Sequence, residues 1–206
     1  MVQRFDDEHE LARAIVERVG NKIVLALPLG LGKGNHVANA LYRLAARDPS
    51  IDLTIFTALS LDPPSGGGGL AGRFAGPLAE RLYDGVTRLD YVDARKKGQL
   101  PPNVRVIEFF LQAGSLLSNR AAQENYVSAN YTHAARYVVE SGVNVVAQMV
   151  APSDGRETYS LGSNTDMTLD LLPVMEEMKG AGREVLLVGE ANREMPFMGG
   201  AAAGDI

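Results

Sequence analysis

A glycine-rich turn carries the strongest chemical signal in the sequence. Gly30, Gly32 and Gly34 alternate within residues 28–35, and Asn35 can cap the helix predicted to follow. Glycines permit a tight turn and a close approach of the backbone, while the first N–H groups of a helix lack intrahelical partners and carry partial positive charge. The segment therefore suits a phosphate, a carboxylate or a developing oxyanion. A tight turn without a ligand explains the spacing equally well.

Two known phosphate-binding motifs do not fit this turn. Lys33 follows Gly32 without the upstream glycine spacing and the Ser or Thr of a Walker A loop. A dinucleotide fingerprint would need a third glycine where Asn35 stands, and an acid after the next predicted strand, which ends in Thr57-Ala58. An unrelated nucleotide-dependent enzyme is therefore disfavoured.

Other polar clusters have a plain structural explanation. Residues 128–133 include His133, a candidate general acid or base, although polar residues that cap and pin a helix are the favoured interpretation. Residues 163–166 have the composition of a helix cap. Glu190 and Glu194 follow a predicted strand, where exposed turn acids are commoner than catalytic ones. No spacing among the three histidines and the acids predicts a metal site.

The elements that must position these residues alternate between strand and helix. Apolar runs too continuous for a half-exposed strand predict buried strands at 23–27, 53–58, 104–110, 143–150 and 185–188. Helical periodicity predicts helices at 6–19, 35–47, 70–84 (broken by Pro77), 121–140 and 166–179 (interrupted by Pro173). This order indicates an α/β fold, a doubly wound, mainly parallel sheet with helices on both faces. Residues 59–69 predict an irregular surface loop, with an active-site lid as the alternative.

Composition excludes several classes of function. The net charge of −5 argues against nucleic acid as a partner, and the only basic run, 95–97, is expected to be a solvated loop. Without cysteine the chain has no disulfide, thiolate metal site or cysteine nucleophile. The acidic N-terminus does not resemble a secretory signal, and no apolar run approaches the roughly 18 residues needed to span a bilayer. We therefore expect a cytoplasmic protein with no membrane partner.

Six segments together resemble the N-terminal half of the acetyl-CoA hydrolase/transferase family, which includes the 4-hydroxybutyrate and succinyl-CoA:acetate CoA-transferases. They occur in the family's order along nearly the whole chain, and residues 1–206 are accordingly expected to form a single N-terminal domain. The glycines at 66–69 depart locally from the family pattern. The segments are 28–35 (PLGLGKGN), 39–42 (NALY), 57–64 (TALSLDPP), 130–136 (NYTHAAR), 142–148 (GVNVVAQ) and 192–198 (NREMPFM).

The resemblance implies covalent catalysis by a glutamate that lies beyond residue 206, in a second α/β domain. That carboxylate attacks an acyl-CoA thioester, and the released thiolate returns to form a glutamyl-CoA thioester. An acceptor carboxylate then takes the CoA, whereas water as acceptor gives hydrolysis. No acid in this chain is assigned the catalytic role, and no cofactor beyond the CoA substrate is implied.

For this chain, the resemblance implies a share in the acyl or oxyanion pocket. The implied partners are an acyl-CoA, a small carboxylate, and the missing C-terminal domain or a partner subunit; a homo-oligomer is compatible with them. The isolated chain should fold but be inactive. A non-catalytic ligand-binding or assembly domain of the same fold is the alternative. The substrate-binding residues expected are Gly30, Leu31, Gly32, Lys33, Gly34 and Asn35, with Asn130 and Asn164 as weaker candidates.

Overall fold

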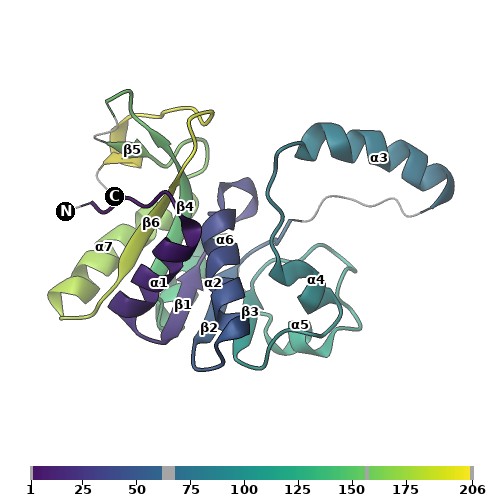
Figure 1. The fold of residues 1–206 in the computed structure, drawn as a ribbon, viewed down its shortest axis with the longest axis horizontal. Helices are drawn as coiled ribbons and strands as arrows, with labels where there is room; N and C mark the ends of the chain where they lie inside the picture. Colours follow the sequence, from purple (N-terminus) through teal and green to yellow (C-terminus); the bar gives the residue numbers. More distant parts are fainter. Residues whose placement is uncertain (1, 62–67, 156–157, 205–206) are drawn as a thin grey trace.

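Five parallel strands form the central sheet of this computed structural model, which describes residues 2–61, 68–155 and 158–204 (Figure 1). Their spatial order is β3-β2-β1-β4-β6, and each neighbouring pair is parallel. The predicted doubly wound, mainly parallel sheet is therefore confirmed. The strands are β1 (Lys22–Ala26), β2 (Asp52–Thr57), β3 (Val104–Glu108), β4 (Val145–Pro152) and β6 (Leu186–Ala191).

The alternation of side chains along β1 divides the core into two layers. Ile23 and Leu25 pack into one apolar cluster, while Val24 and Ala26 pack into the other. Both sets are buried, which explains why this strand is continuously apolar in sequence. The expectation of a buried fifth strand was wrong, because β6 is only partly buried along its length.

Helices cover both faces of the sheet, as predicted. On one face lie α1 (Glu8–Val19) and α2 (Asn35–Arg47), whose buried residues join the first cluster. On the other face lie α6 (Tyr131–Glu140) and α7 (Thr168–Gly180), which contribute to the second. Helix α1 begins where expected because the Asp7 carboxylate accepts hydrogen bonds from two backbone N–H groups of its first turn.

Three helix predictions need correction. Residues 121–140 do not form one helix: α5 (Arg120–Glu124) ends before an extended stretch that runs beside β3, where Val127 N donates to Glu108 O at 3.0 Å. Pro173 lies inside α7, and Pro77 inside α3 (Gly69–Tyr83), without ending either helix. A proline removes one N–H donor, and here that loss did not stop the helix.

Two features were absent from the sequence predictions. Helix α4 (Tyr91–Lys96) contains most of the basic run expected to be a solvated loop, and Arg95 is buried. Two short strands, β5 (Tyr159–Ser160) and β7 (Ala203–Gly204), extend the end of β4 in antiparallel fashion. Within the irregular segment 59–69, residues 62–67 lie outside the described part of the chain. Among the described residues, no helix has the length and apolarity to cross a bilayer.

Candidate ligand-binding site at the glycine turn

The glycine turn lies where the strand order of the sheet reverses, between β1 and β4. In doubly wound sheets, ligands bind beyond the carboxyl ends of the strands at this point. The turn contains a short 3-10 helix, Gly30–Gly32, and Gly30 has a φ of 67°, which favours glycine. Its far end is bridged to β4 through Lys33 and Gln148. The outer part of the turn faces solvent, with Leu31 67% exposed.

The buried side chain of Lys33 holds the turn together through hydrogen bonds. Its Nζ donates to the carbonyl oxygens of Pro28, Gly30 (3.4 Å) and Ala58 (2.8 Å). Burial lowers the pKa of Lys33 to about 7, against the opposing attraction of Glu108 and Asp166. The lysine therefore ties the turn to the chain that follows β2. Its predicted contact with a ligand stays a prediction.

Asn164 and Asp166 hold the other side of the turn. Asn164 Nδ2 donates to Leu29 O at 3.2 Å, and Asp166 Oδ2 accepts from Leu29 N at 2.9 Å. Residues 163–166 were expected to cap the last helix, which was wrong. Helix α7 instead follows Met167, which makes no side-chain cap, because these polar side chains reach across to Leu29. Burial raises the pKa of Asp166.

Asn130 makes a local contact at the start of α6. Its Oδ1 accepts a hydrogen bond from Thr132 Oγ1 at 2.6 Å, and it provides no side-chain cap for α6. The neighbouring Tyr131 donates its hydroxyl to Asp166, which in turn binds Leu29. Helix α6 is thus connected to the turn by Tyr131, whereas His133 is exposed.

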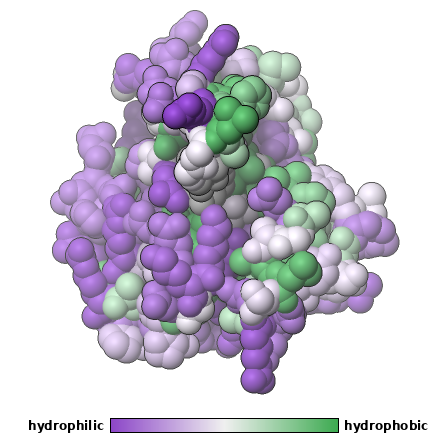
Figure 2. All heavy atoms as spheres, turned by 90° about the vertical axis from the view of Figure 1, so that its right-hand side faces the viewer, coloured by the Kyte–Doolittle hydropathy of each residue, from purple (hydrophilic) through white to green (hydrophobic). Residues whose placement is uncertain are grey.

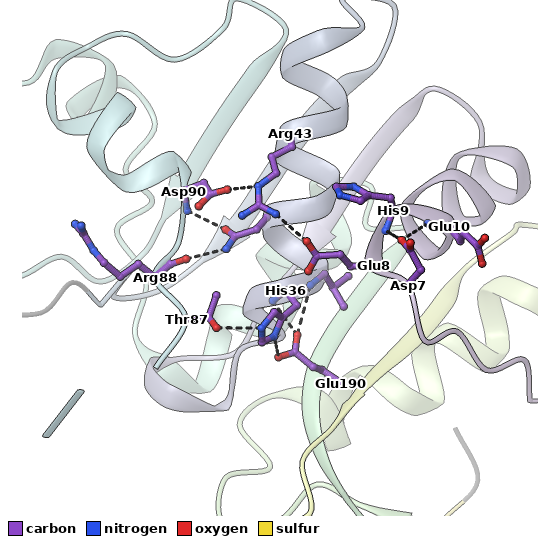
Figure 3. A network of polar contacts seen from close by, with 12 residues as sticks. Asp7, Glu8, His9, Glu10, His36, Arg43, Thr87, Arg88, Asp90 and Glu190 are labelled. Atoms are coloured by element: carbon purple, nitrogen blue, oxygen red, sulfur yellow. Dashed lines mark hydrogen bonds and ion pairs between the residues drawn. The ribbon is translucent and has the colours of Figure 1, made fainter. Parts of the chain in front are cut away.

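Glu190 fills the N-terminus of α2 that the sequence predicted to be open to an anion. Its Oε2 accepts hydrogen bonds from His36 N at 3.0 Å and Val37 N at 3.4 Å, and its Oε1 lies 2.7 Å from His36 Nδ1 (Figure 3). The ring Nε2 of His36 lies 3.0 Å from Thr87 Oγ1. Glu190 is an acid of β6, with a side chain only 16% exposed, rather than an exposed turn residue. The expectation of free amides at these two positions was therefore wrong.

Asn35 fastens the turn to the segment before α4. Its Nδ2 donates to Thr87 O at 2.6 Å, while its Oδ1 is buried without a partner among the described residues. Gly34 packs closely against the Glu190 side chain, since a Cβ added at Gly34 would lie 3.4 Å from Glu190 Oε2. The predicted residues 30–35 and Asn164 are therefore together in space, whereas Asn130 is linked to them indirectly, through the neighbouring Tyr131.

A buried polar network supports the neighbouring edge of the sheet. Arg95 of α4 forms an ion pair with Glu108 at the end of β3, and both side chains are buried. Glu108 Oε1 accepts from Ser60 N at 2.9 Å and Ser60 Oγ at 2.6 Å, and Ser60 Oγ lies 2.7 Å from Tyr91 Oη. Burial raises the pKa of Tyr91. The sequence prediction missed this network, although an acid inside an otherwise apolar strand was a usable signal.

The described cavities lie away from this turn. One of about 300 Å³ is lined by residues of α1 and α2, including Arg13, Arg43 and Arg47, and another of about 200 Å³ lies beside β3. Arg43 is paired with Glu8 at 2.8 Å and Asp90 at 2.5 Å (Figure 3). Among the described residues, no three His, Asp or Glu side chains gather as a metal site.

Comparison with solved structures shows the fold. The chain resembles RipA from Yersinia pestis with a TM-score of 0.61 and 18% identity, over 97% of this chain and 39% of that chain. A single-residue variant of RipA gives 0.60 and 18%, over 94% and 38%. The chain thus spans about two fifths of the RipA chains it matches. A 4-hydroxybutyrate CoA-transferase from Porphyromonas gingivalis gives only 0.46 and 14%, over 94% and 35%. No protein-family model and no curated protein matches the sequence.

Proposed function

We propose that this chain is the N-terminal part of an enzyme that transfers CoA between an acyl-CoA thioester and a carboxylate, or hydrolyses the thioester. The reaction proceeds through a glutamyl intermediate whose glutamate lies outside residues 1–206. The observation that carries this proposal is spatial: four of the six segments that resemble the acetyl-CoA hydrolase/transferase family are far apart in sequence but meet around the glycine turn.

The convergence rests on specific contacts. The turn at 28–35 follows β1, and Lys33 joins it to Ala58 in the segment after β2. Residues 142–148 lead into β4 and form its first residues, and Gln148 bridges to the turn. The segment 130–136 reaches the same turn through Tyr131 and Asp166. Segment 192–198 follows β6 and contacts β5 instead, where Met198 N donates to Ser160 Oγ at 3.0 Å. The segments 28–35, 57–64, 130–136 and 142–148 thus meet beyond the carboxyl ends of the strands, where a parallel sheet binds ligands.

The turn's role in this proposal is to shape a pocket and to offer backbone donors to an acyl oxygen. Lys33 and Asn164 hold the turn from opposite sides, so its backbone is fixed before any ligand arrives. Such preorganised donors stabilise an oxyanion without reorganising during the reaction. Leu31 projects from the turn and would contact the acyl group.

Asp166 contacts the turn itself and Glu190 the helix that follows it, and the oxygens of both acids are already engaged by backbone N–H groups. The carboxylate of Glu190 is engaged by two backbone N–H groups and by the ring of His36. Both carboxylate oxygens of Glu190 are thus held by partners within this chain. By resemblance to the family, we assign the nucleophile to a domain outside residues 1–206.

One observation favours the alternative of a non-catalytic assembly domain. The carboxylate of Glu190 occupies the α2 N-terminus, so that part of the predicted anion site is already neutralised. In that case the α/β partner would bind, but the pair would show no CoA transfer.

Reconstitution tests the proposed function. The purified chain, the α/β polypeptide encoded after residue 206 or by a neighbouring gene, and their mixture are each incubated with acetyl-CoA and isotopically labelled acetate. We expect label to enter acetyl-CoA, or free CoA to be released, only in the mixture. A mixture that forms a complex but transfers no CoA with any of several small carboxylates, and releases none to water, contradicts the proposal.

A further inference from the structure

Helix α3 presents an apolar stripe that no other part of the described chain covers. Each of its residues is at least partly exposed. Figure 2 shows apolar side chains gathered on this side of the molecule. The stripe, which we call the α3 stripe, repeats every fourth residue and consists of Leu70 (83% exposed), Phe74 (79%), Leu78 (45%) and Leu82 (62%).

The composition of α3 makes it a weak helix unless its apolar face is packed against another part of the protein or a partner. Gly72, Gly76 and Pro77 lie in its interior, and these residues are the weakest helix formers. Isolated helices of about 15 residues are marginal in water even with good helix formers, so most helices in proteins depend on a packed apolar face. In Figure 1, α3 extends away from the sheet, and the sheet therefore does not cover its stripe.

The chain that leaves α3 is fastened beside the glycine turn. Thr87 O accepts from Asn35 Nδ2 at 2.6 Å, and Arg88 O accepts from Asn39 Nδ2 at 2.7 Å. Asp90 N donates back to Asn39 Oδ1 at 2.8 Å. A partner domain bound to α3 would therefore lie near the segment that is fixed beside the glycine turn, where Leu31 is also exposed.

We propose that the α3 stripe is the docking surface for the second α/β domain of the enzyme. This inference rests on the proposed function and names the surface through which its partner is held. The matched RipA chains are long enough to leave about three fifths of their length without a counterpart here. A second domain of that size would be larger than residues 1–206.

The α3 stripe alone is smaller than a stable interface. Phe74 can bury roughly 150–250 Å² and each leucine less, so the four partly exposed side chains supply at most on the order of 600 Å². Stable interfaces bury about 800 Å² on each partner. A stable partner must therefore extend beyond the α3 stripe onto neighbouring surface.

Binding of the α/β polypeptide encoded after residue 206 or by a neighbouring gene tests this inference. Its affinity is measured by calorimetry for the full chain, for Phe74→Ala/Leu78→Ala, and for Leu117→Ala as the matched control. Leu117 is an exposed leucine outside α3, and all substituted side chains are exposed, so the fold is retained and checked by circular dichroism. We expect binding at least tenfold weaker for the α3 variant and unchanged for the control.

The other outcomes separate the two proposals. Equal binding by the α3 variant overturns the docking surface, while CoA transfer in the same mixture would leave the proposed function standing. No binding by the unaltered chain overturns the docking surface. A homodimer of the unaltered chain that the α3 variant breaks identifies a second copy as the occupant and likewise overturns it.

Discussion

The backbone N–H of His36 donates to the carboxylate of Glu190 at 3.0 Å, so a side chain from β6 closes the first turn of α2. The contact joins residues far apart in sequence and places a negative charge at the positive end of a helix dipole. The turn that precedes α2 is therefore fixed at both its ends, by Glu190 at the helix and by Asp166 at Leu29.

Replacing Glu190 with Gln should destabilise the protein by about 1 kcal/mol, because the amide keeps an acceptor for the N–H groups but loses the charge that the helix N-terminus favours. Urea unfolding followed by circular dichroism measures the change. Glu194→Gln is the matched control, since Glu194 is exposed and its carboxylate has no described role. Equal stability of the two variants would show that the Glu190 carboxylate does not stabilise the N-terminus of α2.

Breaking the buried ion pair should cost far more. Arg95→Met leaves the Glu108 carboxylate buried without its cation, and such losses destabilise proteins by about 3–5 kcal/mol. Adding Glu108→Leu should recover much of that loss, because no uncompensated charge remains. The double-variant cycle is measured by urea unfolding, with the exposed Arg105→Met as control. A loss no larger than that of the control would show that the pair does not stabilise the fold.

Lys33 predicts a pH dependence of stability. Its folded pKa of about 7 lies below the unfolded value of about 10.4, so between these values the unfolded state binds more protons. Stability conferred by the neutral amine therefore rises with pH through this window and is lost as pH falls toward 7. The free energy of unfolding of the unaltered protein, minus that of Lys33→Met, should increase from pH 7 to pH 9.5.

The exposed Lys22→Met provides the control for that series. Its difference from the unaltered protein should stay level over the same pH range. A level difference for Lys33→Met as well would mean that the folded pKa of Lys33 is close to its unfolded value, and that the three carbonyl groups around Nζ offset its burial.

The sequence predicted the parts of the fold that depend on local pattern. The strand at 23–27 and the helix at 35–47 follow from a continuous apolar run, from helical spacing and from the glycines between them. Arg95 could not be assigned in this way, because its burial depends on Glu108 in another element. Local composition likewise assigned Asp166 to a helix cap, whereas its partner is Leu29, more than a hundred residues away. Contacts of that range are set by packing.

The central claim is that this chain shapes the site while the nucleophile belongs to another domain, and the location of the covalent intermediate tests it most directly. The reconstituted pair is incubated with acyl-CoA and the intact mass of each polypeptide is measured. A glutamyl-CoA thioester forms when the CoA thiolate attacks the acyl-glutamyl anhydride and releases the free carboxylate. We predict that the added mass of CoA, less one water, appears on the partner polypeptide and not on this chain. The same added mass on this chain, traced by proteolysis to one of its own carboxylates, would contradict the account.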